Sequence, residues 1–126
     1  MKMELKEAPK RVQLNGVDYI RIDIHESAFN NDDLPYVIVR AADAGVHIGY
    51  LQFREGDEVH LVDSRRIFYW EGAATLSQMA RDGVSKPDSC KIPCTLPHLI
   101  VFGVCEIIPA TKKCLESIAS VPVWSE

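Results

Sequence analysis

The sequence predicts an α+β fold, with an antiparallel-rich β-sheet and two short helices in a single domain that spans residues 1–126. Two observations carry this prediction. Short segments rich in β-branched residues are separated by turn residues, which is typical of antiparallel strands. Two other segments follow a threonine and have apolar residues at helical spacing. With 47% apolar and 25% charged residues, the composition is ordinary for one hydrophobic core.

The N-terminal region begins with a polar stretch and continues into a strand. Residues 1–11 are mostly polar or charged and are expected to fray. Asn15-Gly16 is a tight-turn signal, and apolar and charged residues then alternate from Asp18 to Ile24. This alternation predicts a half-buried strand whose isoleucines face inward.

The middle of the chain predicts a central strand followed by a hairpin. Tyr36–Val39 is a continuous β-branched run, as expected for a central strand. Val46–Phe53 and Glu58–Val62 are the predicted arms of the hairpin, and Gly56 in the turn allows a positive φ. The second arm is expected to run on through a bulge as far as Trp70.

A short helix is predicted after this aromatic segment. Leu76, Met79 and Ala80 recur at helical spacing, and Thr75 with Gln78 has the form of a capping box. Gly83 provides the C-terminal stop. Residues 84–97 contain three prolines and predict a long, functional loop.

The C-terminal third predicts one strand and a second helix. The apolar run Leu99–Ile108 is expected to form a single buried strand. Thr111 is expected to cap a helix that ends near Ala119, with Leu115, Ile118 and Ala119 as its buried stripe. Trp124 lies close to the C-terminus, so we expect the tail to dock on the body or on a neighbouring subunit.

Charge and composition exclude several classes of partner. The net charge is −4, with acidic and basic residues interleaved, which argues against binding of a nucleic-acid polymer. No apolar run is long enough to span a membrane, and the N-terminus lacks the apolar stretch of a secretory signal. We therefore expect a cytoplasmic protein whose four cysteines are reduced.

Common catalytic and metal-binding motifs are missing from the sequence. The four histidines are scattered, and a partly exposed strand position is the simplest interpretation of each. Cys90 and Cys94 form one pair without a second, so zinc is disfavoured, and Cys105 and Cys114 are expected to be small buried residues. Phosphate-binding glycine loops and nucleophile elbows do not occur. We expect no catalytic residue, no metal and no cofactor.

A pattern of arginines, rings and hydroxyls remains. Guanidinium groups pair with phosphate oxygens, aromatic faces stack on a base, and hydroxyls or amides read its edges. The residues of this pattern are Arg40, Arg54, Arg65, Arg66, Tyr69, Trp70, Ser77 and Gln78. The pattern favours a small anionic nucleotide as ligand. Alternatively, the arginines are paired on solvated strand faces, the two aromatic rings are core, and Gln78 only completes the helix cap.

Several pieces of the sequence resemble a family of small phage-encoded proteins. They are GVHxGYL, REGxEV, SRRIxYW, GAAxLSQ and the late EIIPxT, all in order, and the stretch from Gly45 to Trp124 that contains them is about two thirds of the chain. In these pieces the chain looks like the Thoeris anti-defence sponges, which bind cyclic nucleotide immune signals of the host bacterium and hold them without cleavage. The first thirty residues match nothing in the family.

The resemblance implies a homo-oligomer built from dimers, up to a hexamer, in the host bacterial cytosol, with ligand pockets at subunit interfaces. It implies a glycocyclic ADP-ribose type of ligand, and cyclic trinucleotides at a separate pocket. The matching stretches and the chemistry together predict these binding residues: Arg54, Gly56, Ser64, Arg65, Arg66, Ser77, Gln78 and Met79. Two alternatives stay open, namely a viral structural or partner-binding module without a nucleotide, and an enzyme whose residues converge only in the fold.

Overall fold

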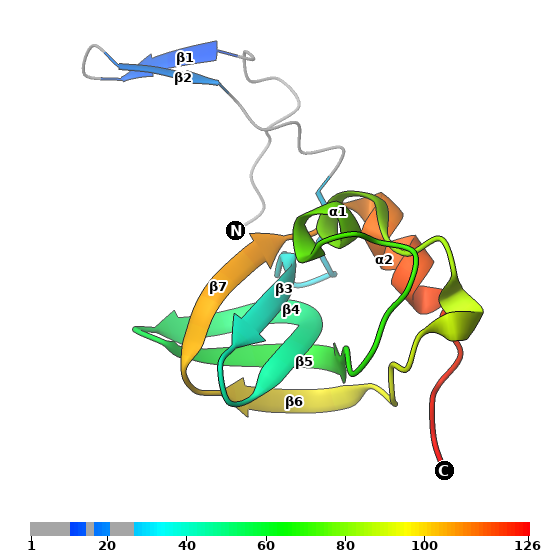
Figure 1. Ribbon diagram of the computed structural model, residues 1–126. Helices are drawn as coiled ribbons and strands as arrows, with labels where there is room; N and C mark the ends of the chain where they lie inside the picture. The colour runs from blue at the N-terminus through cyan, green and yellow to red at the C-terminus, as the bar shows by residue number, and fades with distance from the viewer. Residues whose placement is uncertain (1–10, 15–16, 21–26) are drawn as a thin grey trace.

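Five antiparallel strands form the main sheet of the computed structural model, which describes residues 11–14, 17–20 and 27–126 (Figure 1). The strands are β3 (Tyr36–Ala41), β4 (Gly45–Glu55), β5 (Glu58–Arg66), β6 (Leu96–Val101) and β7 (Val104–Pro109), in the spatial order β6-β5-β4-β3-β7. The helices are α1 (Leu76–Asp82) and α2 (Lys112–Ala119), with a 3₁₀ turn, η1, at Pro87–Ser89. The predicted α+β fold with an antiparallel sheet and two short helices is confirmed.

The sheet curls into a partly closed barrel. β6 and β7 are its two edge strands, yet only Phe102 and Gly103 connect them. Four strand spacings of a flat sheet would span about 19 Å, whereas the three peptide steps of this connection reach at most about 11 Å. The edges must therefore approach each other. The single strand predicted over Leu99–Ile108 is wrong, because Gly103 with φ 74° allows a tight reversal in its middle.

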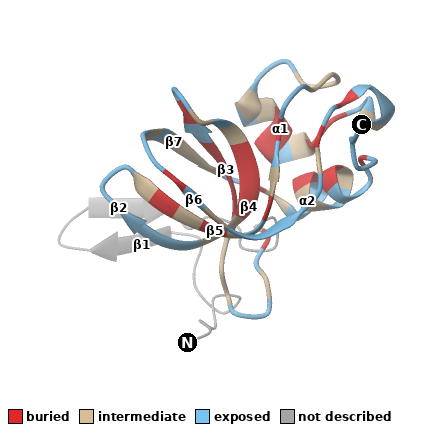
Figure 2. Cartoon of the chain, turned by 90° about the horizontal axis from the view of Figure 1, so that it is seen from below, coloured by how far each residue is buried: buried red, intermediate tan, exposed pale blue. Residues whose placement is uncertain are grey.

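Two hydrophobic cores lie on opposite faces of the curled sheet. The barrel interior is made by Val37, Val39, Ala41, Val59, Leu61 and Val101. The second core lies between the other face and the helices, and it includes Tyr36, Ile38, Ile48, Met79 and Ile118. β3 contributes alternate residues to each core, which is why its whole apolar run is buried, as the central strand in Figure 2 shows. The predicted central strand is confirmed.

The hairpin is confirmed, with longer arms than expected. Gly56 has φ 59° in the turn between β4 and β5. The β4–β5 register shifts next to Gly49, and Asp63 on the facing strand has φ 50°, so β5 passes a bulge before it ends at Arg66. The strand does not continue to Trp70, because the aromatic segment that follows makes only an isolated bridge from Tyr69 to Lys91.

Both helices begin at the predicted threonines. The Thr75 hydroxyl accepts from the Gln78 N–H at 3.1 Å, while the Gln78 amide oxygen accepts from the Ala74 N–H at 2.9 Å, one residue before the position of a capping box. The Thr111 hydroxyl accepts from the Cys114 N–H at 3.1 Å. Neither helix in the described part of the chain has the length or apolar run that a membrane crossing requires.

The buried stripe of α2 differs from the prediction. Cys114 and Ile118 are its buried residues, whereas Leu115 is half-buried and Ala119 is exposed. Burial raises the pKa of the Cys114 thiol to about 12, which keeps it protonated and unreactive. Cys105, also predicted to be buried, is exposed near the free edge of β7.

The N-terminal predictions lie mostly outside the described residues. A separate pair of antiparallel strands, β1 (Arg11–Leu14) and β2 (Val17–Ile20), covers only the start of the predicted strand, and β1 was not predicted. The turn predicted at Asn15-Gly16, the part of the predicted strand at residues 21–24 and the fraying predicted before Arg11 all fall outside the described ranges.

Candidate functional site

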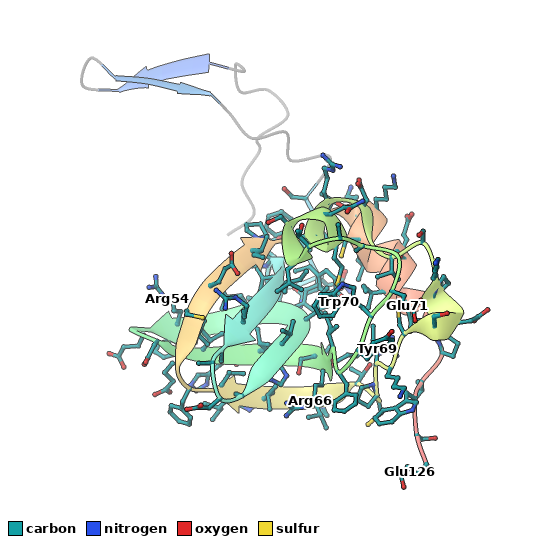
Figure 3. The ribbon with its side chains drawn as sticks, viewed as in Figure 1. Arg54, Arg66, Tyr69, Trp70, Glu71 and Glu126 are labelled. Atoms are coloured by element: carbon teal, nitrogen blue, oxygen red, sulfur yellow. The ribbon has the colours of Figure 1, made fainter. Side chains whose placement is uncertain are left out.

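The eight predicted binding residues do not converge on one pocket. Arg54 and Gly56 lie at the tip of the β4–β5 hairpin, and Arg66 lies at the other end of β5 (Figure 3). Ser77, Gln78 and Met79 are on α1, and Ser77 is exposed there. The eight residues therefore lie in separate parts of the fold, namely the hairpin tip, the end of β5 and helix α1.

Three of these residues are explained by the fold. Ser64 is 1% exposed and packs so closely on Gly49 that a β-carbon there would lie 2.7 Å from the Ser64 β-carbon. Met79 is fully buried in the core under the helices. Gln78 closes the first turn of α1 with its amide. These contacts account for the three side chains within the fold, although the Ser64 hydroxyl has no hydrogen-bond partner among the described residues, and their role in ligand binding stays a prediction.

Arg65 holds the C-terminal segment in place. Its Nε donates to the Pro93 carbonyl at 2.9 Å, and its Nη1 donates to the Ile118 carbonyl at 2.9 Å. Its Nη2 donates to the Ile92 carbonyl at 2.8 Å and lies within 3.5 Å of the carbonyls of Val121 and Pro122. Burial lowers the pKa of this guanidinium, which the carbonyl oxygens surround. Arg65 therefore serves as an internal clamp, and its predicted role in a ligand pocket stays a prediction.

Arg66 borders a hollow on the described surface. This Arg66 hollow has a volume of about 460 Å³ and lies between the β3–β4 turn and the end of β6. Its lining residues are Asp43, Ala44, His47, Arg66, Leu99, Ile100, Val101, Phe102 and Gly103. Ile100 and Phe102 are 43% and 64% exposed, so the hollow has apolar walls beside a cation. Its volume falls in the range of about 300–1,000 Å³ that small-molecule sites occupy.

Two side chains converge on one carbonyl inside the Arg66 hollow. His47 and Arg66 are direct partners in the β4–β5 pairing, so their side chains leave the same face of the sheet. The Arg66 Nη1 donates to the Ala44 carbonyl at 2.9 Å, and the His47 Nε2 lies 2.8 Å from the same oxygen. His47 is only 2% exposed, and desolvation lowers its pKa.

Sequence reasoning missed most of this site. His47 was expected to be a partly exposed strand histidine, which is wrong, because strand alternation places it toward the barrel interior. Asp43 and Phe102 lie in turns and match no motif. The one available signal was the phase of the alternation in β4, which puts His47 on the same face as Leu51 of the interior core.

The second hollow holds Arg54 and Gly56. It has a volume of about 260 Å³ and is closed on the other side by Val104, Cys105, Glu106 and Ile107 of β7. Arg54 donates to the Gly56 carbonyl at 3.1 Å, and the carboxylate of Glu106 pairs with Arg40 at 2.9 Å. The smaller size and the carboxylate in the wall make it a weaker candidate for an anion.

A third surface is aromatic and lies beside the C-terminus. Phe68 and Trp124 stack with ring centroids 5.2 Å apart, and the Lys91 ammonium lies 5.7 Å from the Trp124 centroid. The backbone N–H of Trp124 donates to the Ile92 carbonyl at 3.1 Å, so the tail docks on its own body, which is one of the two predicted possibilities. Tyr69 is 44% exposed, not a core residue, and its hydroxyl donates to Glu71 at 2.8 Å.

Comparison with known proteins gives a family but no activity. No match was found among curated proteins, and none among solved structures. A family model described as a domain of unknown function (DUF6948) matches residues 34–118, which include all five strands of the barrel, α1 and all of α2 except Ala119. The matched stretch is well over half of the chain. The chain therefore belongs to the family described as domain of unknown function DUF6948.

Proposed function

We propose that the protein binds and sequesters a small anionic nucleotide without cleaving it, and that the Arg66 hollow is the binding site. The observation that carries the proposal is the exposed guanidinium of Arg66 at the rim of a hollow with apolar walls. Only one of its donors is used within the described residues, by the Ala44 carbonyl. The remaining N–H groups of the guanidinium can donate to phosphate oxygens, two at a time, because they form a planar fork.

The apolar wall of the hollow is suited to the base of a nucleotide. Phe102 sits in the two-residue turn between β6 and β7, where more than half of its ring surface is open. A base stacked on such a ring gains about 1–3 kcal/mol. Together with charge-assisted bonds this can approach the roughly −12 kcal/mol of a nanomolar complex, provided that the site becomes enclosed.

Enclosure requires a second subunit in this proposal. The Arg66 hollow is open in the single chain, and sequestration needs slow release. The resemblance to the Thoeris anti-defence sponges supports a homo-oligomer built from dimers, with the ligand held at a subunit interface. A glycocyclic ADP-ribose type of signal in the host bacterial cytosol is the proposed ligand, and the same resemblance implies a separate pocket for a cyclic trinucleotide.

Calorimetric titration with glycocyclic ADP-ribose and with a cyclic trinucleotide tests the proposal. We expect submicromolar binding of the first ligand, at least a tenfold loss of affinity in Arg66→Gln, and no loss of affinity in Arg54→Gln, which removes the charge of another exposed arginine, outside the hollow. The released ligand should be chemically intact after the protein is denatured. Conversion of the ligand would make the protein an enzyme, and equal losses in the two variants would remove the Arg66 hollow from the proposal.

The exposed aromatic surface favours a second candidate function. Phe68 and Val123 are 59% and 60% exposed beside the stacked Trp124, and aromatic rings of this kind are enriched in protein interfaces. A viral structural or partner-binding module would use this surface and would need no nucleotide. In that case Trp124→Ala would abolish an oligomer or a partner complex, while neither nucleotide would give heat.

A further inference from the structure

His47 is a buried polar residue with a function left to explain. Its ring lies among Ala44, Arg66 and the end of β6, and only 2% of the residue is exposed. A carbonyl oxygen can only accept, so the contact of 2.8 Å with the Ala44 oxygen requires a proton on Nε2. In the neutral ring the other nitrogen, Nδ1, then carries a lone pair and can only accept a hydrogen bond.

The lone pair of Nδ1 is not used by any described residue. Within the described residues, Nδ1 has no hydrogen-bond partner, and Ser64 Oγ is the one fully buried side-chain oxygen or nitrogen that lacks a partner. Nδ1 must therefore keep some access to solvent, and the hollow is the space that His47 lines. A ligand that fills the hollow displaces water from this acceptor, which costs free energy unless the ligand supplies a donor in its place, so the hollow is suited to a ligand that brings one.

The positions of the polar groups in the hollow are coupled. Because His47 Nε2 and Arg66 Nη1 share the Ala44 oxygen, the imidazole and the guanidinium are held side by side. Asp43, in the same lining, offers a second, exposed acceptor. The hollow thus has one cation flanked by acceptors. A bare inorganic anion would satisfy the cation and leave Nδ1 unpaired, whereas a phosphorylated sugar brings the anion and the donor in one molecule.

We infer that the Arg66 hollow recognises a phosphorylated ribose, with the phosphate on Arg66 and a ribose hydroxyl donating to Nδ1 of His47. The inference rests on the proposed function for the location of the site, and it adds that the ribose hydroxyl is the part of the ligand that His47 recognises. A sugar hydroxyl that lies between these two groups must donate to Nδ1 and accept from the guanidinium. A hydroxyl can do both at once. Rejection of analogues without the hydroxyl follows, since they would leave the buried acceptor unsatisfied.

NMR titration of the protein with adenosine 5′-monophosphate and with its 2′,3′-dideoxy analogue tests the inference, because it gives the dissociation constant of each ligand. In the unmodified protein we expect the dideoxy compound to bind at least tenfold more weakly. In His47→Gln, whose amide can still donate to the Ala44 carbonyl, the ratio of the two dissociation constants should fall to about one. This ratio is informative because a purely structural role of His47 would weaken both ligands equally.

The outcomes separate the two proposals. If the unmodified protein binds the two monophosphates equally, or binds neither at millimolar concentration, the inference is overturned. The proposed function would still stand in both cases if glycocyclic ADP-ribose binds in an Arg66-dependent way. A discrimination ratio that persists in His47→Gln, in a variant whose melting temperature stays close to that of the parent, would also overturn the assignment of Nδ1.

Discussion

Replacement of Arg65 by alanine should strongly destabilise the protein, because it removes the clamp on the C-terminal segment. The guanidinium makes three bonds of 2.8–2.9 Å to the carbonyls of Ile92, Pro93 and Ile118, segments that lie far apart in the chain. A hydrogen bond from a charged donor contributes about 1.5–3 kcal/mol. Three such bonds are not additive, and water can reach carbonyls in a half-buried place. We therefore expect a loss of about 3–5 kcal/mol.

This loss is large against a typical domain stability of about 5–15 kcal/mol. Urea unfolding followed by circular dichroism measures it, and with a slope of about 1–3 kcal/mol per molar the midpoint should fall by about 2 M. Arg54→Ala is the matched control, since Arg54 is exposed and bonds only within its own hairpin, and it should change stability by less than about 0.5 kcal/mol. Arg65→Lys should recover only part of the loss, because an ammonium cannot reproduce the planar fork. A loss below about 1 kcal/mol in Arg65→Ala would refute the clamp.

Two further predictions concern the sheet. Gly49→Ala should destabilise the fold by about 1–3 kcal/mol in the same unfolding assay, since its new methyl group would meet the Ser64 β-carbon at 2.7 Å, and a neutral effect would mean that the bulge can relax. Burial lowers the pKa of His47 below its ordinary value of 6.5, so the unfolded chain takes up this proton first as the pH falls. The stability that His47 contributes should be complete above pH 6.5 and decline below it, until the folded protein also binds the proton. Arg66 and Asp43 line the same hollow, and Arg66 lowers the pKa further. The difference in unfolding free energy between the parent and His47→Gln should therefore vary with pH below 6.5, and a constant difference would contradict the assignment.

Local signals in the sequence were sufficient for most secondary-structure elements. Thr75 and Thr111 cap helices because a threonine hydroxyl satisfies an N–H of the first turn whatever the rest of the chain does. Gly56 marks the hairpin turn because a positive φ is inexpensive only for glycine. The continuous apolar run of β3 required two buried faces, and it has them.

The errors arose where a local pattern has two solutions. Leu99–Ile108 is apolar enough for one strand, and only the closure of the barrel decides that it folds back at Gly103 to place β6 and β7 on opposite edges. Ala119 has helical spacing for the buried stripe of α2, but the helix is rotated so that Cys114 is buried instead. Helical spacing fixes the width of an apolar face, while packing partners fix its direction.

The sequence by itself determined the fold class, the hairpin turn at Gly56 and the two threonine helix caps. These depend on backbone geometry and on hydrogen bonds within one turn, which act locally. Only the tertiary structure decided what each arginine does. Arg65 and Arg66 are adjacent in the chain, yet alternation along a strand sends one into the carbonyls of the C-terminal segment and the other to the rim of a hollow. The site around His47 was likewise assembled by the curl of the sheet, which brings the β3–β4 turn to the end of β6.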